Sequence, residues 1–355
     1  MQKEETSVFL REIVMTLAKH NYELKEKIGS GGFASVYKCK NIRYNEIFCV
    51  KVIEVPEGAK ESLVMSFDSE FQTLVKIIHP NIITLFDHFR SEHCLFLILE
   101  YCPNGSCADL IVKNGGPLEV PKLIELFRII LQAINYIHSI GIAHRDIKPQ
   151  NILIDVHHRP KLADFGLAEF YQADQKKAKY GGSLAYMAPE LVLKKEFNAE
   201  AVDIWALGIS FFQITTGTLP WVTPQVAKEI MAGFVFIPNE IDPQISQLLR
   251  KMLQAEPSRR PTSSQLLQLP IFNNDNTDQY QPTLTTMPLK QMSFIAPAIS
   301  SFNSNKMTTS ASIINHKSRR KMKNQVFSKK RVSLSYTFSE DETPEPNNVS
   351  DSFLK

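Results

Sequence analysis

The sequence predicts an α+β protein built of two unlike lobes and followed by a disordered tail. Strand-like patterns come first, between about residues 22 and 100, and helical patterns follow from about residue 121 to residue 253. Strands followed by a run of helices are typical of α+β proteins. After Phe272 the composition shifts to Ser, Thr, Asn and Lys with few periodic apolar positions, which predicts disorder to residue 355.

The composition is that of a globular chain. Of 355 residues, 43% are hydrophobic and 22% charged, which excludes a wholly disordered chain, a collagen-like repeat and a disulfide-stapled miniprotein. The formal net charge of +3 is too small for a globally basic nucleic-acid binder. Five cysteines without a C-x-x-C pair predict reduced thiols in a cytosolic or nuclear protein. No apolar run approaches the roughly 18 residues of a membrane span, and no signal peptide is readable.

The elements are predicted from their periodicity, in chain order. Residues 6–20 carry apolar side chains at helical spacing, which favours an amphipathic helix docked on the body over a helix for a partner or a membrane. Strands are predicted around Val36–Cys39 and Ile47–Val50, and a buried strand over residues 94–100. A first helix is expected over 61–78. Further helices are expected over 123–140, 203–216, 224–232 and 245–253.

A glycine-rich turn precedes the first of these strands, with the sequence Gly29-Ser30-Gly31-Gly32-Phe33-Ala34-Ser35-Val36. Such a turn lets backbone N–H groups approach phosphate oxygens closely. Alone the pattern also fits dinucleotide sites and plain hairpins. A dinucleotide site needs a helix directly afterwards, whereas the residues from Val36 alternate as a strand, and no GxxxxGK[ST] loop is present. Both the dinucleotide site and the P-loop are therefore disfavoured.

A lysine and a glutamate follow the turn. Lys51 ends the apolar run that begins at Phe48, and Glu70 lies on the next predicted helix. An isolated lysine after a strand is usually a solvated charge. Here a Lys–Glu pair between strand and helix could hold the ammonium group against a phosphate.

The most specific segment is His144-Arg145-Asp146-Ile147-Lys148-Pro149-Gln150-Asn151, which Asp164-Phe165-Gly166 follows. One carboxylate can accept a hydroxyl proton, while the other carboxylate and the Asn carbonyl ligate Mg²⁺ through hard oxygens. His-Arg-Asp alone also fits a surface turn. The string continues in order with Ala188-Pro189-Glu190 and Asp203-Ile204-Trp205, which chance does not explain.

Together these motifs resemble the eukaryotic protein kinase family of the serine/threonine type, over about residues 22–272. Leu219-Pro-Trp and Arg259-Arg-Pro-Thr resemble the calmodulin-dependent-kinase-like group. The resemblance implies a bilobal kinase fold, with a small β-rich N-lobe (about 22–101) and a larger helical C-lobe (about 102–272). Residues 1–21 would be a helical extension and 273–355 the disordered tail.

The resemblance also implies the roles of the site residues, with ATP and Mg²⁺ as cofactors. Asp146 would be the catalytic base, Lys148 would contact the transferred phosphate, and Lys51 would bind the α/β-phosphates with Glu70 as its helix partner. Asn151 and Asp164 would ligate Mg²⁺. Glu190 and Arg260 would form a structural ion pair. The nucleotide would contact Lys51, the hinge residues Glu100 and Cys102, and the loop residues Ile28, Gly29, Ser30, Gly31, Gly32, Phe33, Ala34, Ser35 and Val36.

Other features concern the substrate and activation. Lys148 indicates a serine/threonine kinase, Leu167 favours Ser acceptors, and the hydroxyl of Ser183 is expected to bridge Asp146 and Lys148. The three places where Arg-directed kinases carry acids hold Ser106, Gln150 and Gln213, so no strong preference for upstream Arg is predicted.

The activation segment, residues 169–183, has no Ser or Thr besides Ser183. Arg145 precedes the catalytic Asp146 and is the residue that binds a phosphorylated loop residue in many relatives. Asp174 or Glu169 would satisfy Arg145 instead, or Tyr180 or Tyr171 would be modified. Activation by a partner that repositions the helix carrying Glu70 is the alternative.

The tail is the most basic part of the chain. Residues 273–355 hold eleven Lys/Arg and seven Asp/Glu, with clusters at Lys317–Lys323 and Lys329–Arg331. A solvated extension is the favoured interpretation. A bipartite signal for a nuclear import receptor is the second, and Ser333 could be a site for another kinase. Contacts with nucleic acid or a membrane are not expected, because no aromatic interleaving or amphipathic helix accompanies the charges.

The expected function is an active protein serine/threonine kinase acting on protein substrates as a monomer or weak oligomer. The alternative is an ATP-binding pseudokinase or scaffold that signals through its conformation. It is disfavoured because Lys51, Asp146, Asn151 and Asp164 are all present. A small-molecule kinase of similar fold is the third option.

Overall fold

The computed structural model describes residues 2–31, 34–55, 70–113, 118–170, 182–221 and 225–273, without the side chains of residues 2–8, 31, 169 and 170. Several sequence predictions lie outside the described residues: Gly32, Phe33, residues 61–69 of the first predicted helix, Tyr171, Asp174, Tyr180 and the tail from residue 274.

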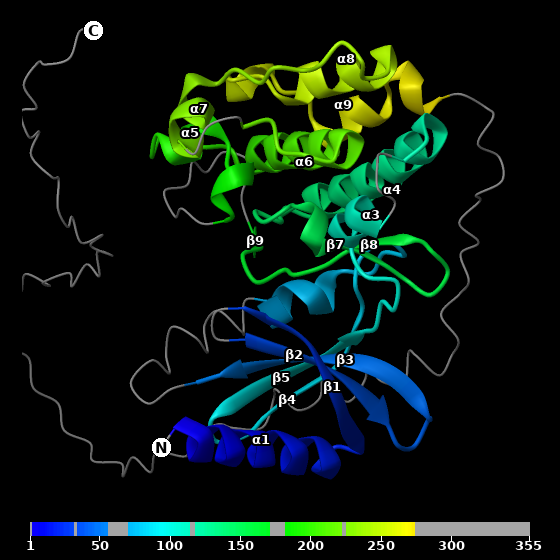
Figure 1. Cartoon of the computed structure of the whole chain (residues 1–355), viewed down its shortest axis with the longest axis vertical. Helices are drawn as coiled ribbons and strands as arrows, with labels where there is room; N and C mark the ends of the chain where they lie inside the picture. The colour runs from blue at the N-terminus through cyan, green and yellow to red at the C-terminus, as the bar shows by residue number, and fades with distance from the viewer. Residues whose placement is uncertain are drawn as a thin grey trace, which may run out of the picture. The chain divides into compact units, whose positions relative to one another are not determined.

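A five-stranded antiparallel sheet forms the first part of the fold, with the strand order β1-β2-β3-β5-β4 (Figure 1). Its strands are β1 (Tyr22–Gly31), β2 (Ala34–Asn41), β3 (Glu46–Glu54), β4 (Leu85–Arg90) and β5 (Cys94–Glu100). The predicted buried strand is confirmed in β5, whose first five residues are all buried. The sequence analysis missed β4.

The N-terminal helix α1 (Gln2–Lys19) covers one face of this sheet, as predicted. Ile13 and Leu17 are fully buried in one apolar cluster with residues of β2 to β5. Glu12 accepts hydrogen bonds from the Ser91 hydroxyl (2.5 Å) and the His93 N–H (3.0 Å), in the turn between β4 and β5. Leu10 and Val14 of the predicted apolar stripe face outward, 43% and 45% exposed.

Helices make up most of the second part (Figure 1). They are α3 (Cys107–Lys113), α4 (Val120–Ser139), α5 (Pro189–Val192), α6 (Ala199–Thr216), α7 (Val226–Ala232), α8 (Pro243–Met252) and α9 (Ser263–Leu267). Helix α6 begins four residues before its predicted start, because the Asn198 side chain caps it by accepting from the Ala201 N–H at 2.8 Å. No helix among the described residues is long and apolar enough to cross a membrane.

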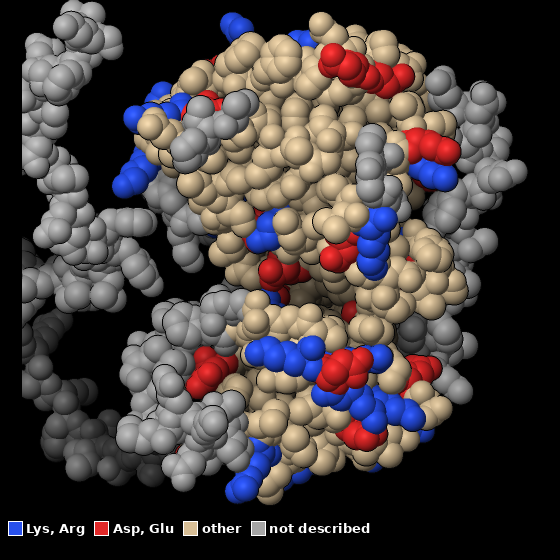
Figure 2. Space-filling view, in the orientation of Figure 1, with Lys and Arg blue, Asp and Glu red and all other residues tan. Residues whose placement is uncertain are grey.

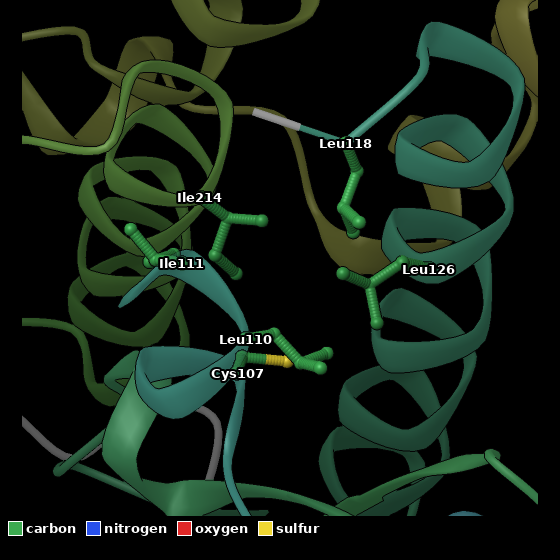
Figure 3. Close-up of a pocket in the computed structure, with 6 residues that line it drawn as sticks. All are labelled: Cys107, Leu110, Ile111, Leu118, Leu126 and Ile214. Atoms are coloured by element: carbon green, nitrogen blue, oxygen red, sulfur yellow. The ribbon is translucent and has the colours of Figure 1, made fainter. Parts of the chain in front are cut away.

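The helices α3, α4 and α6 pack around a small apolar cavity of about 10 Å³ (Figure 3). A space of this size holds at most one water molecule. It is lined by Cys107, Leu110, Ile111, Leu118, Leu126 and Ile214. The cavity is therefore a gap in the core packing and not a ligand site.

Short strands carry the loops that lie between the sheet and the helices. They are β6 (Ile142–Ala143), β7 (Ile152–Ile154), β8 (Pro160–Leu162) and β9 (Glu169–Phe170), paired β6 with β9 and β7 with β8. A parallel bridge joins Leu162 of β8 to Ile82, in the segment that leads into β4. Asn81 donates its side-chain amide to Pro160 O at 3.1 Å. These bonds fix the strand before Asp164 against the first part of the fold.

Candidate active site

Lys51 is the centre of a three-residue charged cluster that the sequence analysis predicted only in part. Its Nζ lies 2.9 and 3.0 Å from the two oxygens of Glu70, on the helical stretch 70–76, and 2.9 Å from Asp164 Oδ1. Strand β3 supplies the lysine, and residues beyond β8 supply the aspartate. The structure thus brings together the predicted phosphate-binding lysine, its helix partner and one predicted metal ligand.

Lys51 and Asp164 are each held in the charged form within this cluster. Burial acts to lower the pKa of Lys51, but Glu70 and Asp164 outweigh burial and raise the pKa above its ordinary value. Burial acts to raise the pKa of Asp164, yet Lys51 outweighs it, so this pKa lies below its ordinary value. Near neutral pH the lysine is therefore a cation and Asp164 an anion, the states that phosphate and metal binding need.

Asp146 lies in a second cluster, where both of its carboxylate oxygens accept hydrogen bonds. Oδ2 accepts from Lys148 Nζ (2.7 Å) and Asn151 Nδ2 (3.1 Å). Oδ1 accepts from the Ser183 hydroxyl (3.0 Å) and the Ser183 N–H (3.2 Å). Lys148 Nζ also donates to the Ser183 hydroxyl at 2.9 Å. The predicted bridge of Ser183 between Asp146 and Lys148 is confirmed.

The loop that carries Asp146 is held in place by Asp203 of α6. This carboxylate is fully buried and accepts the backbone N–H groups of His144 and Arg145, each at 2.8 Å. Arg145 has a φ of 70° and Asp164 a φ of 63°. Such left-handed backbone is costly for residues other than glycine, so surrounding bonds must fix it. Sequence reasoning treated Asp203 only as part of a motif; its signal was one acid inside the apolar run Val202–Leu207.

The donor set fits a magnesium ion. Asn151 uses its Nδ2 to donate to Asp146 O (2.8 Å) and to Asp146 Oδ2, which turns its amide oxygen into the candidate ligand. Asp164 is 47% exposed, so its carboxylate remains accessible while Oδ1 contacts Lys51. Carboxylate and amide oxygens are hard ligands, and Mg²⁺ uses few of them together with phosphate oxygens and water.

The predicted nucleotide-binding residues lie on neighbouring strands. Across β1 and β2, Gly29 pairs with Val36, Ser30 with Ser35, and Gly31 with Ala34. Val36 in turn pairs with Lys51 of β3, so the glycine turn and the lysine are adjacent. Ile28 of β1 is 45% exposed. Figure 2 shows a hollow between the sheet and the helices with acidic side chains at its edge.

The predicted hinge follows β5. Glu100 ends this strand, and its N–H donates to Thr84 O at 2.9 Å. Cys102, two residues later, is partly buried, and burial raises the pKa of its thiol to about 12, with a further contribution from Glu100. The thiol is therefore neutral, and this segment can offer a nucleotide its backbone groups and apolar contacts.

The predicted pair of Glu190 and Arg260 is confirmed, and it lies inside the helical part. Arg260 Nη1 and Nη2 lie 2.6 and 2.8 Å from the two Glu190 oxygens, and the Arg260 side chain is fully buried. Arg260 also donates to Gln254 O and Ala201 O. The pair joins the segment after Ser183 to the segment before α9, so its role is architectural.

Comparisons with known proteins agree with this geometry. A family model described as "Protein kinase domain" matches residues 22–272. The chain is 31% identical over 269 residues to a probable serine/threonine-protein kinase MARK-A of Dictyostelium discoideum, covering 75% of this chain and 25% of that protein. It is 30% identical over 253 residues to CBL-interacting serine/threonine-protein kinase 12 of Arabidopsis thaliana (70% and 51%). It is 35% identical over 257 residues to maternal embryonic leucine zipper kinase of Xenopus tropicalis (70% and 38%). The chain spans between a quarter and about half of these relatives' lengths.

Proposed function

The chain belongs to the protein kinase family, and from this premise we propose that it transfers the γ-phosphate of ATP to Ser and Thr hydroxyls of protein substrates. One observation carries the proposal: both charged clusters are complete. Lys51 contacts Glu70 and Asp164, and Asp146 is bonded to Lys148 and Ser183. Phosphoryl transfer depends on positioning and charge neutralisation, which these clusters supply.

Asp146 orients the acceptor and takes its proton. Because Lys148, Asn151 and Ser183 all donate to its carboxylate, the side chain has one fixed orientation. A substrate hydroxyl that replaces the Ser183 hydroxyl or joins it at this carboxylate is aimed at the phosphate. Lys148 remains beside it, so its ammonium group offsets negative charge that develops on the transferred phosphoryl group.

Lys51 binds the phosphates of the nucleotide. Its ammonium group is fixed by Glu70, which is 3% exposed and keeps the lysine extended toward Asp164. The lysine can then bind phosphate oxygens without losing this partner. Asn151 and Asp164 would hold Mg²⁺, which when bound neutralises charge on the β- and γ-phosphates. The hinge backbone at Glu100 and Cys102 would bind the adenine.

The alternative of a pseudokinase or scaffold is not favoured. A chain that signals by shape alone has no need for a carboxylate held by three donors, as Asp146 is. A small-molecule kinase is also disfavoured, because the Ala188–Glu190 segment is fixed by the buried pair with Arg260 and can serve as a floor for a peptide.

No strong preference for upstream Arg is proposed, although the structure adds one acid that sequence reasoning missed. Asp109 Oδ2 lies 2.7 Å from both the N–H and the hydroxyl of Ser106. These bonds lower the pKa of Asp109 and occupy that oxygen. Gln213 accepts from the Tyr186 hydroxyl at 2.6 Å. A substrate cation would therefore have to compete with existing bonds at two of the three places. A peptide library dominated by Arg three residues before the acceptor would contradict this proposal.

The location and the tail remain predictions. A cytoplasmic protein is proposed, with nuclear import if the clusters at Lys317–Lys323 and Lys329–Arg331 act as a signal. A reporter fused to residues 306–355 tests this: nuclear accumulation that is lost when both clusters are changed to alanine supports it, and diffuse signal contradicts it.

The activity is tested with the whole chain, Mg²⁺, γ-labelled ATP and a degenerate Ser/Thr peptide library. Asp146→Asn is the matched control, because it keeps the size of the side chain but removes its charge and replaces one acceptor oxygen with an amide donor. We expect transfer that needs Mg²⁺ and falls by about a hundredfold or more in Asp146→Asn. Equal transfer by both proteins, or ATP binding without transfer, would refute the proposed activity.

A further inference from the structure

A further, largely buried ion pair lies beside the proposed nucleotide site, and its side chains have no part in the chemistry described above. Lys161 of β8 directs its ammonium group at both carboxylate oxygens of Glu100, with Nζ 2.7 Å from Oε1 and 2.9 Å from Oε2. The Lys161 side chain is 6% exposed and that of Glu100 21%. The two residues are 61 positions apart in the chain, so the contact is a feature of the fold.

The chain segments that continue from the two partners lead to opposite ends of the proposed nucleotide site. Glu100 begins the segment whose backbone would bind the adenine. Lys161 lies three residues before Asp164, which contacts Lys51 at the phosphate end. The pair therefore forms a direct link between the hinge, which would position the adenine, and the segment from β8 to Asp164, which carries the candidate metal ligand.

Each partner lies in a segment that is fixed by backbone hydrogen bonds. The ion pair therefore fixes the position of one segment relative to the other. Glu100 donates its N–H to Thr84 O at 2.9 Å, while the Thr84 N–H donates to Glu100 Oε2 at 3.3 Å. On the other side, Leu162 next to Lys161 donates its N–H to Asn81 O at 2.9 Å and accepts from the Ile83 N–H at 2.9 Å. Both side chains therefore extend from segments with hydrogen-bonded backbone.

Fold stability does not explain why the pair is charged. Two charges taken from water lose much of their hydration, and apolar residues of similar volume often replace such a pair without loss of stability. Two charge-assisted hydrogen bonds do fix the relative position of two segments more tightly than apolar contact does. Two other titratable groups near Lys161 do not compete for its charge. Burial and the Lys161 charge lower the pKa of His79 to about 4, and burial raises the pKa of the Cys102 thiol to about 12.

We propose that Lys161 is a positioning residue for the nucleotide. Through Glu100 it fixes the position of the hinge backbone relative to Asp164. The site for the adenine and the site for the phosphates are thereby kept at the spacing that one ATP molecule requires. This inference rests on the proposed function, because it assumes that ATP occupies the site between the hinge and Asp164. It predicts an effect on nucleotide affinity that is separate from any effect on folding.

Four variants of the whole chain separate the two effects. Lys161→Met leaves the Glu100 carboxylate buried without its cation and should lower the melting temperature. Lys161→Met with Glu100→Met removes both charges and should restore most of the melting temperature. Lys161→Arg keeps a cation that can reach both carboxylate oxygens. Arg128→Met removes another ion pair of similar length within α4, Glu125–Arg128 at 2.7 and 2.9 Å, and serves as the matched control.

The readouts are the dissociation constant of Mg-ATP by calorimetry, and KM for ATP beside kcat. For the double methionine variant we expect the dissociation constant and KM to rise about tenfold, with kcat changed much less. Lys161→Arg should recover most of this loss, and Arg128→Met should behave as the unaltered chain.

A double methionine variant with unaltered ATP affinity and KM would overturn the proposal and leave the pair a packing feature. A fall in kcat alone would overturn it as well. The binding arm needs no catalysis, so ATP binding without transfer would count against the proposed activity while this comparison still decides the role of Lys161. A chain that binds no ATP would refute both.

Discussion

Ser183→Ala tests how the second charged cluster works. The Ser183 hydroxyl accepts from Lys148 Nζ at 2.9 Å and donates to Asp146 Oδ1 at 3.0 Å. The alanine variant loses both bonds. It keeps the backbone N–H of residue 183 on Asp146 Oδ1 (3.2 Å) and the direct contact of Lys148 with Asp146 Oδ2 (2.7 Å). The carboxylate and the ammonium group therefore remain together, but the carboxylate loses one of its two bonds on the Oδ1 side.

The magnitude follows from these remaining contacts. A hydrogen bond to a charged group contributes about 1.5–3 kcal/mol. Because the Asp146–Lys148 pair persists, we count the loss of one such bond. With about 1.36 kcal/mol for each tenfold change in rate, kcat should fall about 10- to 150-fold. KM for ATP should change little, because the hydrogen bonds of Lys51 go to Glu70 and Asp164 and not to Ser183.

The assay is steady-state transfer to the best peptide of the library, with ATP and peptide varied in turn. Ser183→Thr is the matched control, since it keeps the hydroxyl and adds one methyl group, and it should retain most of kcat. Ser183 is only half-buried, so the melting temperature should be similar in all three proteins. An alanine variant with unaltered kcat would refute the reasoning, and so would a threonine variant as slow as alanine.

Two further predictions concern stability and use chemical unfolding. Leu17 of α1 is fully buried, so Leu17→Ala should lower the unfolding free energy by about 2–5 kcal/mol; Leu10→Ala, at a 43% exposed position of the same helix, should change it little. Asp155 is 2% exposed and accepts from the N–H groups of His157 and Arg159. Burial acts to raise its pKa, but the bonds and charge of Arg159 outweigh burial and lower it. Its stabilisation is therefore present above the unfolded value of about 4 and is lost as pH falls through the folded pKa. The advantage of the unaltered chain over Asp155→Asn should shrink below about pH 4, and an advantage that stays constant there would contradict this assignment.

The sequence could predict those parts of the site that lie close together in the chain. Asp146, Lys148 and Asn151 fall within six residues, and the loop geometry that brings them together is set locally by Pro149 and one 3₁₀ turn. Lys51 and Glu70 were paired in the sequence only as a possibility, and the family resemblance supplied their roles, since no local rule joins residues 19 positions apart. The contact of Lys161 with Glu100 had no signal at all, because a lysine in a short strand looks like an ordinary solvated charge.

There are also physical reasons why some helices and strands could not be predicted from the sequence. Strand β4 (Leu85–Arg90) contains Asp87 and His88, and a register shift between Leu85 and Asp87 breaks its alternation. Helix α3 has only seven residues, too few for a periodic pattern to stand out. The starts of α4, α6 and α8 were placed late because apolar periodicity marks the middle of a helix, whereas the cap marks its beginning, as Asn198 does for α6.

The alternation of β3 connects the N-terminal helix to the chemistry. Val50 and Val52 of this strand are fully buried in the cluster that contains Ile13 and Leu17 of α1. Side chains of a strand alternate between its two faces, so burying the valines under α1 directs Lys51 to the opposite face, toward Glu70 and Asp164. A slip of one residue would bury the lysine under α1 and turn the valines into the cleft. The apolar face of α1 therefore opposes that slip, and in this way a helix on the other face of the sheet helps to fix the orientation of Lys51.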